Sequence, residues 1–501
     1  MGGLAMKNNK ALIRNLVILV VICVGMLVLD KVVGIFKKEP AKPYNPSNIQ
    51  EVSISLDEWI GWKPLIYANG GLTTTADSIN ARNGIRVRYV VMNDASVSSA
   101  ALISGEIQGA GYTINRYAFL QSKFDEANLE VIMPYITNYS NGADGIIARA
   151  DIKSVSDLVG KKIAVPRYSE AQTLVEWLIK NSSLSSEEID GIKKNMVYCE
   201  TADDAAEAFF AGRVDAAATW EPYLTQAASS TKSRILFDTS MGTNLILDGL
   251  VFRTDFLNEN EEFITKLIDG ALEANVMYLR EFESIKVMPM FELMDSDEIK
   301  EMCSNASVAN WADNKNILGT TASIMYKDMA NIWISIGEKA VPEKAESAFT
   351  TKYIDSLYDK YSDSDVTSFA FSQEGRQAAQ QISNNSALLS VRLDIKFETD
   401  SYKISSDSYE ALNKFADTAK VLNGVYIQIE GNTAKVDGDD GKDFSYKRAR
   451  SVAKFLQALG IDSRRFIIIG NGDTNPIDTN QTEEGRSNNR RTEVFFKVIG
   501  Y

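Results

Sequence analysis

Polar side chains follow two predicted strands at the points where predicted helices begin. They form two sets, Ser96, Ser98 and Ser99 after the strand expected at 85–91, and Tyr168, Ser169 and Glu170 after the strand expected at 162–165. Hydroxyl groups and the free N–H groups of a helix start bind oxyanions and other polar groups. The sequence therefore predicts two facing helix starts that clamp a small polar molecule.

Aromatic and further polar side chains extend this predicted site. Trp59, Trp62, Trp220 and Tyr168 can supply apolar or stacking walls. Packing in a core or between lobes explains Trp62 and Trp220 equally well. Asn141, Glu221 and Asp248 add amide and carboxylate groups. For Asp248, and for Asp144, a place in the site and a solvated loop position both stay open.

The composition excludes several kinds of chemistry. The 501 residues include no histidine, which removes Ser-His-Asp and Cys-His catalysis and histidine metal sites. The three cysteines, Cys23, Cys199 and Cys303, form no CxxC pair, and a bridge between the last two stays open. We expect no catalytic residues, no metal and no cofactor. The formal net charge of −14 argues against nucleic acid as a partner.

Strands and helices alternate from residue 52 to about residue 361. Predicted strands at 52–56, 85–91, 162–165 and 214–219 are separated by amphipathic stretches. Ser185-x-x-Glu188 is typical of a capping box, and Thr201 is a predicted N-cap. This order indicates an α/β fold with mainly parallel sheets. In such sheets ligands bind at the carboxyl ends of the strands.

Four runs in this region resemble a known family. They are SLDEWIGWKPLIYANGGL (55–72), LISGEIQGAG (102–111), IKSVSDLVGKKIAV (152–165) and GRVDAAATWEPY (212–223). The runs are similar to the substrate-binding proteins of ABC importers for nitrate, sulfonates, taurine and thiamine-pyrimidine precursors. The resemblance implies a type II periplasmic-binding fold, in which two α/β lobes close on a small ligand. An ABC transporter permease is the partner that the resemblance implies.

The carboxyl-terminal part is predicted to be a second α/β module with the order β-α-β-α-β-β. Its strands are expected at 389–397, 425–429, 466–469 and 493–498, and its helices carry apolar stripes at 412–419 and 449–459. The EGNT turn (430–433), the FSYKRARSVAKFLQALGI run (444–461) and the run 470–496 resemble the OmpA-like peptidoglycan-binding domain.

That resemblance implies a site for the diaminopimelate head of the wall peptide. In the family an Asp after the G-x-T turn and an Arg at the helix start hold its amine and carboxylate ends. Arg448 matches the Arg, whereas Ala434 stands at the Asp position. A substitute carboxylate could come from Asp437, Asp439 or Asp440. Peptidoglycan is therefore an uncertain partner, and the candidate residues are Thr433, Arg448, Asn489 and Arg490. For Asn489, Arg490 and Arg491 a structural role is an alternative, which we prefer for Arg491.

The amino-terminal part is predicted to be a membrane anchor. Residues 16–29 carry no charge, the apolar pattern resumes after Asp30 and Lys31 and reaches 36, and Lys7, Lys10 and Arg14 precede it. The apolar length favours a transmembrane helix, and the preceding cations favour a cytoplasmic amino terminus. No signal-peptide cleavage site follows the run, which favours an anchor that stays attached. The predicted division is 1–38 cytoplasmic tip and anchor, 39–49 proline-rich spacer, 50–361 two-lobed domain, 362–386 linker and 387–501 OmpA-like domain.

The sequence thus predicts a non-enzymatic, single-pass protein of the cell membrane with its domains on the extracytoplasmic side. Its predicted function is to capture a small polar molecule of the sulfonate, nitrate or pyrimidine and amine types for an ABC importer. A wall-linked ligand sensor and a structural tether remain alternatives. The fold relative with chemistry, the pyrimidine-precursor synthase of thiamine biosynthesis, draws on an active-site histidine that this chain lacks.

Overall fold

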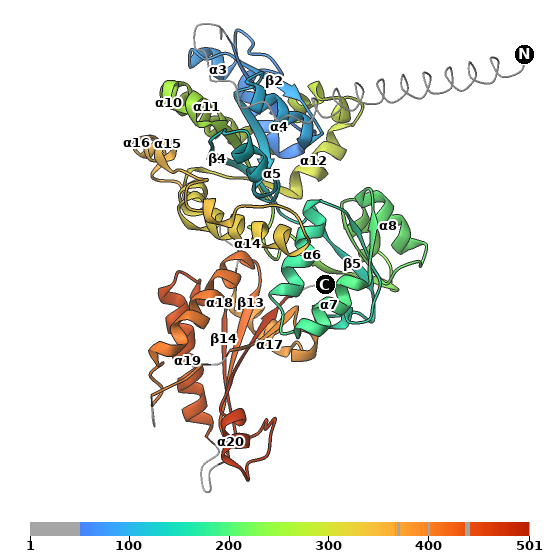
Figure 1. Ribbon diagram of the computed structural model, residues 1–501, viewed down its shortest axis with the longest axis vertical. Coiled ribbons are helices and arrows are strands. Elements are labelled where there is room, and N and C mark those ends of the chain that lie inside the picture. Colours follow the sequence, from blue (N-terminus) through green and yellow to red (C-terminus); the bar gives the residue numbers. More distant parts are fainter. Residues whose placement is uncertain are drawn as a thin grey trace, which may run out of the picture.

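Three sheets with their covering helices make up the described part of the chain (Figure 1). The computed structural model describes residues 51–365, 367, 371–393, 395–398, 401–435 and 441–499. The predicted anchor and spacer, and the acidic run that holds Asp437, Asp439 and Asp440, lie outside these residues. Within the described ranges, no helix combines the length and the apolar character that a bilayer span requires.

The first lobe contains a six-stranded sheet with the order β11-β4-β10-β3-β1-β2. Its strands are β1 (Val52–Leu56), β2 (Val87–Val91), β3 (Gly109–Thr113), β4 (Val131–Ser140), β10 (Leu247–Arg253) and β11 (Ala306–Val308). Its early helices are α2 (Lys63–Asn69), α3 (Ile79–Arg82), α4 (Ala95–Ser104) and α5 (Ile114–Glu126). Later helices of the lobe are α10 (Thr254–Glu259), α11 (Glu261–Ala274), α12 (Ser296–Ser304), α13 (Trp311–Asn316), α14 (Ala322–Ser335), α15 (Lys352–Asp355) and α16 (Tyr358–Tyr361).

The second lobe contains a five-stranded sheet with the order β7-β6-β8-β5-β9. Its strands are β5 (Asp144–Arg149), β6 (Ile163–Pro166), β7 (Met196–Cys199), β8 (Ala216–Trp220) and β9 (Ser233–Asp238). Its helices are α6 (Glu170–Lys180), α7 (Ser186–Lys194), α8 (Ala202–Phe210) and α9 (Tyr223–Ala228). Ser185 and Thr201 cap α7 and α8 with capping boxes, as the sequence predicts.

The chain crosses between the lobes twice, from β4 to β5 and from β9 to β10. These two crossings correct the prediction of mainly parallel sheets. β10 runs antiparallel to β3 and β4, and β5 runs antiparallel to β8 and β9. Each is the first strand after a crossing. It therefore starts at the strand ends that face the other lobe and runs back against its neighbours. The remaining pairs around β1 and β6 are parallel.

The carboxyl-terminal domain has a four-stranded sheet with the order β12-β15-β13-β14. Its strands are β12 (Leu389–Leu393), β13 (Tyr426–Asn432), β14 (Phe466–Gly472) and β15 (Thr492–Lys497), and its helices are α18 (Tyr409–Val421), α19 (Lys442–Ala458) and α20 (Glu483–Asn489). The predicted β-α-β-α-β-β order is present, with α20 added between the last two strands.

Both faces of this sheet are covered. Ile427 and Ile429 of β13 are buried in the same cluster as the apolar stripes of α18 and α19. The alternate residue Tyr426 packs instead with Ala379 of α17 (Gln373–Gln381). Part of the segment predicted as a polar linker is therefore a helix that covers the sheet.

Candidate ligand-binding sites

One edge of the first sheet gathers polar side chains from distant parts of the sequence. Asp57 directly follows β1, and Thr113 ends β3. Asp248 of β10 lies opposite Thr113 in one neighbouring strand and opposite Asn138 in the other. Because β10 runs against β3 and β4, its first residues meet the ends of those strands. This edge therefore carries the groups expected of a ligand site in an α/β lobe.

The second lobe offers a matching edge. Asp144 begins β5 and lies opposite Trp220, the last residue of β8. The Ser140 hydroxyl of the first crossing donates to Asp144 Oδ2 at 2.7 Å and lies 2.8 Å from the Thr239 hydroxyl of the second. Asp144 is therefore held at the hinge where the two lobes join.

The two helix starts predicted from the sequence are α4 and α6, but the start of α5 is what contacts α6. Thr113 Oγ1 donates to Glu170 Oε1 at 3.0 Å, and Arg116 Nη2 lies 3.3 Å from Glu170 Oε2. Arg116 Nη1 also donates to the Tyr168 carbonyl at 3.1 Å. Glu170 thus joins the lobes through a charged pair.

Three carboxyl groups of this region have raised pKa values, and Glu170 contributes to each rise. Enclosure by protein atoms raises the pKa of Asp57 to about 6, although its side chain is still open to solvent, and nearby Glu170 adds to the rise. Partial burial raises the pKa of Asp144 to about 6, again with a contribution from Glu170. Burial raises the pKa of Asp248 well above its usual range, and Asp57, Glu170 and Asp144 add to it. The positive charge of Arg116 acts in the opposite direction and lowers the pKa of Asp57.

The predicted aromatic walls have different surroundings. Trp62 is 1% exposed and donates to Asp57 Oδ1 at 2.6 Å, and Trp59 donates to Asn138 Oδ1 at 2.8 Å. Tyr168 is exposed and has a left-handed φ of 57°, a conformation that costs free energy for a tyrosine. Trp220 is 48% exposed, and its indole donates to Asp203. Trp62 therefore belongs to the core and positions Asp57, while Trp220 and Tyr168 are accessible.

The predicted hydroxyl groups mostly bond within the protein. Ser98 is buried against the Tyr112 hydroxyl at 2.8 Å, and Ser99 donates to the Ser96 carbonyl. Ser169 caps α6 by accepting from the Gln172 N–H. Only Ser96 has an exposed side chain among these four.

The two remaining candidates also have protein partners. Asn141 donates to Ser307 Oγ at 3.0 Å, beside the hinge. Glu221 accepts from the N–H and the hydroxyl of Thr225. Asp57 and Arg116 are the residues of this region that the sequence reasoning missed. The sequence could have identified Asp57 as a site residue, because it comes immediately after a predicted strand.

Cys199 and Cys303 are both free thiols, with Cys303 buried. In the part of the chain that the structure describes, no group of three or more His, Cys, Asp or Glu side chains is arranged to hold a metal ion.

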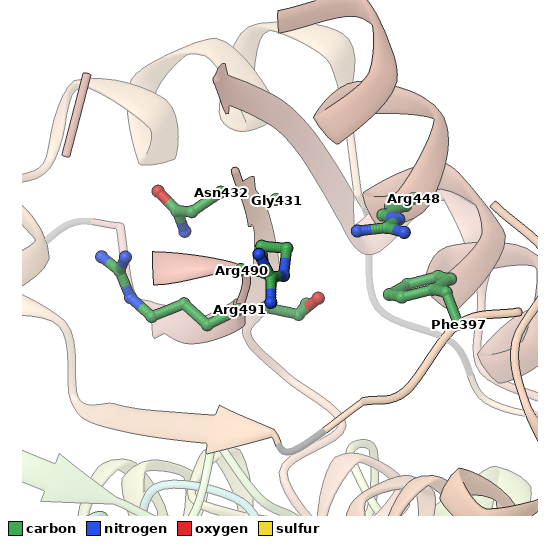
Figure 2. A pocket seen from close by; sticks show the side chains of 7 residues that line it. Phe397, Gly431, Asn432, Arg448, Arg490 and Arg491 are labelled. Atoms are coloured by element: carbon green, nitrogen blue, oxygen red, sulfur yellow. The ribbon is translucent and has the colours of Figure 1, made fainter. Parts of the chain in front are cut away.

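A small pocket, partly open to solvent, lies in the carboxyl-terminal domain (Figure 2). Arg448 of α19 lies at one side, and Arg490 and Arg491 lie between the end of α20 and the start of β15. The other lining residues, Phe397, Gly431, Asn432 and Thr492, carry no charge. We call this the arginine pocket.

The guanidinium of Arg448 is held between two aromatic rings. It lies 4.6 Å from the ring centre of Phe397 and 4.4 Å from that of Phe444, and Nε donates to the Ser401 carbonyl at 3.2 Å. Arg490 Nη2 pairs with Glu483 at 2.5 Å, and Arg491 Nη2 pairs with Glu493 at 2.8 Å. The pocket thus brings together Arg448 and Arg490, which the sequence predicts, with Arg491.

The other predicted wall-binding residues lie outside the pocket lining. Asn489 is fully buried, and its side chain bonds the backbone of Ile477 and Asp478, so it shapes the loop before α20. The Thr433 hydroxyl is buried without a partner among the described residues. Ala434 is 6% exposed, and its methyl group offers no charge to an amine.

The comparisons with known proteins divide the chain in the same way. The sequence model described as NMT1/THI5 like matches residues 81–280, and that of the OmpA family matches residues 396–490. The chain is 31% identical over 132 residues to outer membrane protein A of Bordetella avium, covering 25% of this chain and 67% of that protein. It is 36% identical over 102 residues to the peptidoglycan-binding protein ArfA of Mycobacterium tuberculosis, covering 20% of this chain. The chain spans only 31% of the length of ArfA.

The two-lobed region also has a likeness among solved structures. The periplasmic aliphatic sulphonate binding protein SsuA of Escherichia coli is 18% identical, with a TM-score of 0.46 over 60% of this chain and 97% of that chain. That score is too low to support an argument about ligand or mechanism. The two-lobed architecture is instead established by the strand orders and the two crossings described above.

Proposed function

Since the chain belongs to the OmpA family through its carboxyl-terminal domain and carries an NMT1/THI5-like domain before it, we propose that it is an extracytoplasmic solute-binding protein that binds a small cation between its lobes for an ABC importer. The carboxyl-terminal domain contacts the cell wall in this proposal. Residues 1–38 anchor the chain in the membrane.

The charge of the inter-lobe site is the observation that carries the choice of ligand class. Asp57, Asp144, Asp248 and Glu170 influence one another, and Arg116 is already paired with Glu170. A sulfonate or nitrate would meet repulsion from Asp57 and Asp144, because pKa values of about 6 leave both carboxyl groups ionised at pH 7.5. A protonated amine or aminopyrimidine would instead favour the ionised form of these carboxyl groups, which burial disfavours. The reason is that an opposite charge nearby stabilises an ionised carboxylate. Exposed Tyr168 and Trp220 are available to stack on such a ligand.

A thermal-shift screen of the full chain tests this proposal. Primary amines, quaternary ammonium compounds and aminopyrimidines are compared with alkanesulfonates and nitrate at pH 7.5. A ligand present at a hundredfold its Kd adds about 2.7 kcal/mol of stability. We expect stabilisation by a cation that weakens in Asp57→Asn and persists in Asp190→Asn, an exposed position on α7. Stabilisation by a sulfonate or nitrate alone would reject the cationic ligand.

The pH dependence of cation binding gives a second check. Asp57 and Asp144 have pKa values raised to about 6, so both ionise between pH 5.5 and 7.5. Binding should tighten over this range by about fourfold for each of the two carboxylates that contacts the cation. An affinity that falls as the pH rises would contradict the proposed charge pairing.

A wall-linked sensor is a second candidate, favoured by contacts between the carboxyl-terminal domain and the hinge. The Gly424 N–H donates to the Met241 carbonyl at 2.9 Å. Asn423 accepts from the Thr243 N–H at 3.0 Å and donates to its hydroxyl at 2.9 Å. Met241 belongs to the second crossing, between β9 and β10, and is buried in one apolar cluster with Leu422. Lobe closure would therefore strain or relieve this contact, and a wall-bound domain could report ligand occupancy.

Sedimentation with purified sacculi separates the two candidates. The full chain is tested with and without the best stabilising cation from the screen. A sensor shows a ligand-dependent change in the bound fraction that Asn423→Ala reduces and Asn413→Ala, at an exposed position on α18, leaves intact. An importer subunit shows the same bound fraction with and without the cation.

A further inference from the structure

The segment before α12 in the first lobe carries two apolar stripes, of which one is buried and the other exposed. It contains two short 3₁₀ helices, Glu283–Val287 and Pro289–Phe291, and hydrogen bonds between residues three apart continue to residue 294. Side chains three residues apart share one face of such turns. The buried stripe, which packs into the apolar core, consists of Ile285, Met288 and Phe291. The exposed stripe, which we call the apolar ridge, consists of Val287, Met290 and Leu293.

The apolar ridge is exposed although the segment that carries it is held in place. The Met290 N–H donates to Glu58 Oε1 at 2.6 Å, and the Ser296 hydroxyl of α12 donates to Glu283 Oε1 at 2.9 Å. Leu293 is nevertheless 95% exposed. A fixed apolar surface of this kind marks a contact with a protein or a membrane.

Apolar exposure is concentrated in this part of the chain. Val276 and Leu279, which precede the ridge, are exposed as well, so residues 276–293 hold five exposed large apolar side chains. No other stretch of this length among the described residues holds more than three. The ridge therefore differs from the scattered single apolar residues that are normal on a protein surface.

The chemistry of the ridge suits lipid better than a protein partner. The residues that dominate binding between proteins are enriched in Trp, Tyr and Arg, whereas the ridge consists of Val, Met and Leu. Residues 281–301 contain seven acidic and two basic residues, so charge does not attract this surface to anionic lipid. A membrane contact here depends on apolar side chains that enter the boundary between headgroups and acyl chains.

The place of the ridge in the molecule agrees with a membrane contact. β1, the first strand after the predicted anchor and spacer, belongs to the same lobe. Residues 39–50 can span at most about 40 Å, so the anchor of the proposed function keeps this lobe near the bilayer. Figure 1 shows α12, which follows the ridge, in the half of the molecule away from α20. A bilayer beside the ridge therefore leaves the carboxyl-terminal domain on the far side.

We propose that the apolar ridge enters the outer surface of the bilayer and holds the first lobe against the membrane. This inference rests on the membrane anchor in the proposed function. Three apolar side chains bind lipid weakly by themselves, but the anchor supplies a high effective concentration. Glu58, which bonds the ridge, directly follows Asp57, so the contact keeps the inter-lobe site close to the bilayer.

Fluorescence quenching in vesicles tests the inference. The full chain is reconstituted into phosphatidylcholine vesicles with brominated acyl chains, which quench tryptophan on contact, and the wild-type signal is subtracted. Leu293→Trp places a probe on the ridge, and Ile477→Trp places one at an exposed apolar position before α20. We expect at least about twofold stronger quenching at residue 293, because an interfacial side chain reaches the acyl boundary. Equal quenching at the two positions, or none at residue 293, overturns the proposal.

Charge changes test the apolar character of the contact. In the Leu293→Trp protein, Met290→Asp should reduce the quenching about twofold or more, because a charge is costly in the apolar part of a membrane. Ser304→Asp, at an exposed position on α12, adds the same charge outside the ridge and should leave the quenching unchanged. Equal effects of the two substitutions would argue against lipid contact by the ridge.

Flotation of the same vesicles separates this inference from the proposed function. If the chain floats with the vesicles and residue 293 is not quenched, the anchor stands, the lipid contact is wrong, and the ridge belongs to a protein interface. If the chain does not float, both the anchor and this inference are refuted. Solute binding between the lobes is still judged by the thermal-shift screen.

Discussion

Replacing Asp144 by asparagine should make the protein more stable at neutral pH. Asparagine keeps the size of the side chain and an oxygen that can accept from Ser140, which lies 2.7 Å from Asp144 Oδ2. Partial burial raises the pKa of Asp144 from 3.8 to about 6. The folded protein therefore holds this proton more tightly than the unfolded chain does. The free energy of unfolding consequently falls as the pH rises from about 4 to 6 and then levels off.

The size of the effect follows from this shift in pKa. Each unit is worth about 1.4 kcal/mol, so a rise of about two units corresponds to about 3 kcal/mol. Solvent screening of a partly exposed carboxylate reduces the expected gain for Asp144→Asn to about 1–2 kcal/mol above pH 6. Below pH 4 the variant and the wild type should have equal stability, because both side chains are then neutral.

Urea unfolding of the full chain at pH 4, 5, 6 and 7.5 measures the difference. Tryptophan fluorescence can follow the transition, since Trp62 and Trp177 are buried in the two lobes. Asp190→Asn, on the exposed face of α7, is the control and should show no gain that depends on pH. A variant that is less stable than the wild type at pH 7.5, or a difference that is the same at every pH, would refute the electrostatic reasoning.

Three further substitutions test other parts of the structure. Arg465→Met should cost about 3 kcal/mol or more in urea unfolding, because the buried guanidinium donates to three main-chain carbonyls that would lose their partner. Ser169→Ala should cost about 1 kcal/mol by removing the N-cap of α6, which thermal unfolding can measure. Ala434→Asp should increase sedimentation with sacculi that contain diaminopimelate, and the gain should shrink at high salt; no gain would argue against the family mode of wall binding.

Local sequence patterns determined most of the individual elements. The alternation at 425–429 and the stripe at 449–459 predict β13 and α19, because burying one face of a strand or helix requires those periods. The caps at Ser185 and Thr201 are local hydrogen bonds between residues three apart, so the sequence alone suffices to predict them. The family resemblances likewise depend on contiguous runs, and the comparisons confirm them over residues 81–280 and 396–490.

Tertiary structure alone decided the chemistry of the two sites. Asp57, Asp144 and Asp248 are far apart in the chain, and their pKa values rise mainly because the fold encloses them in protein, with smaller contributions from neighbouring carboxylates such as Glu170. The hydroxyl groups of Ser98 and Ser169, promising as ligand contacts in the sequence, are used by Tyr112 and by the start of α6. Those bonds depend on which groups the fold places nearby, and no local pattern encodes that.

The carboxyl-terminal pocket illustrates the same division. The sequence identifies Arg448 and shows that Ala434 lacks the expected charge. It does not show that Arg491 is buried with two nitrogen atoms that have no partner among the described residues, because burial depends on how β15 packs beside β13. The sequence determines which type of residue stands at each position. The packing of distant segments determines its solvent exposure and its hydrogen-bond partners. These in turn determine the free energy of the side chain and what it can bind.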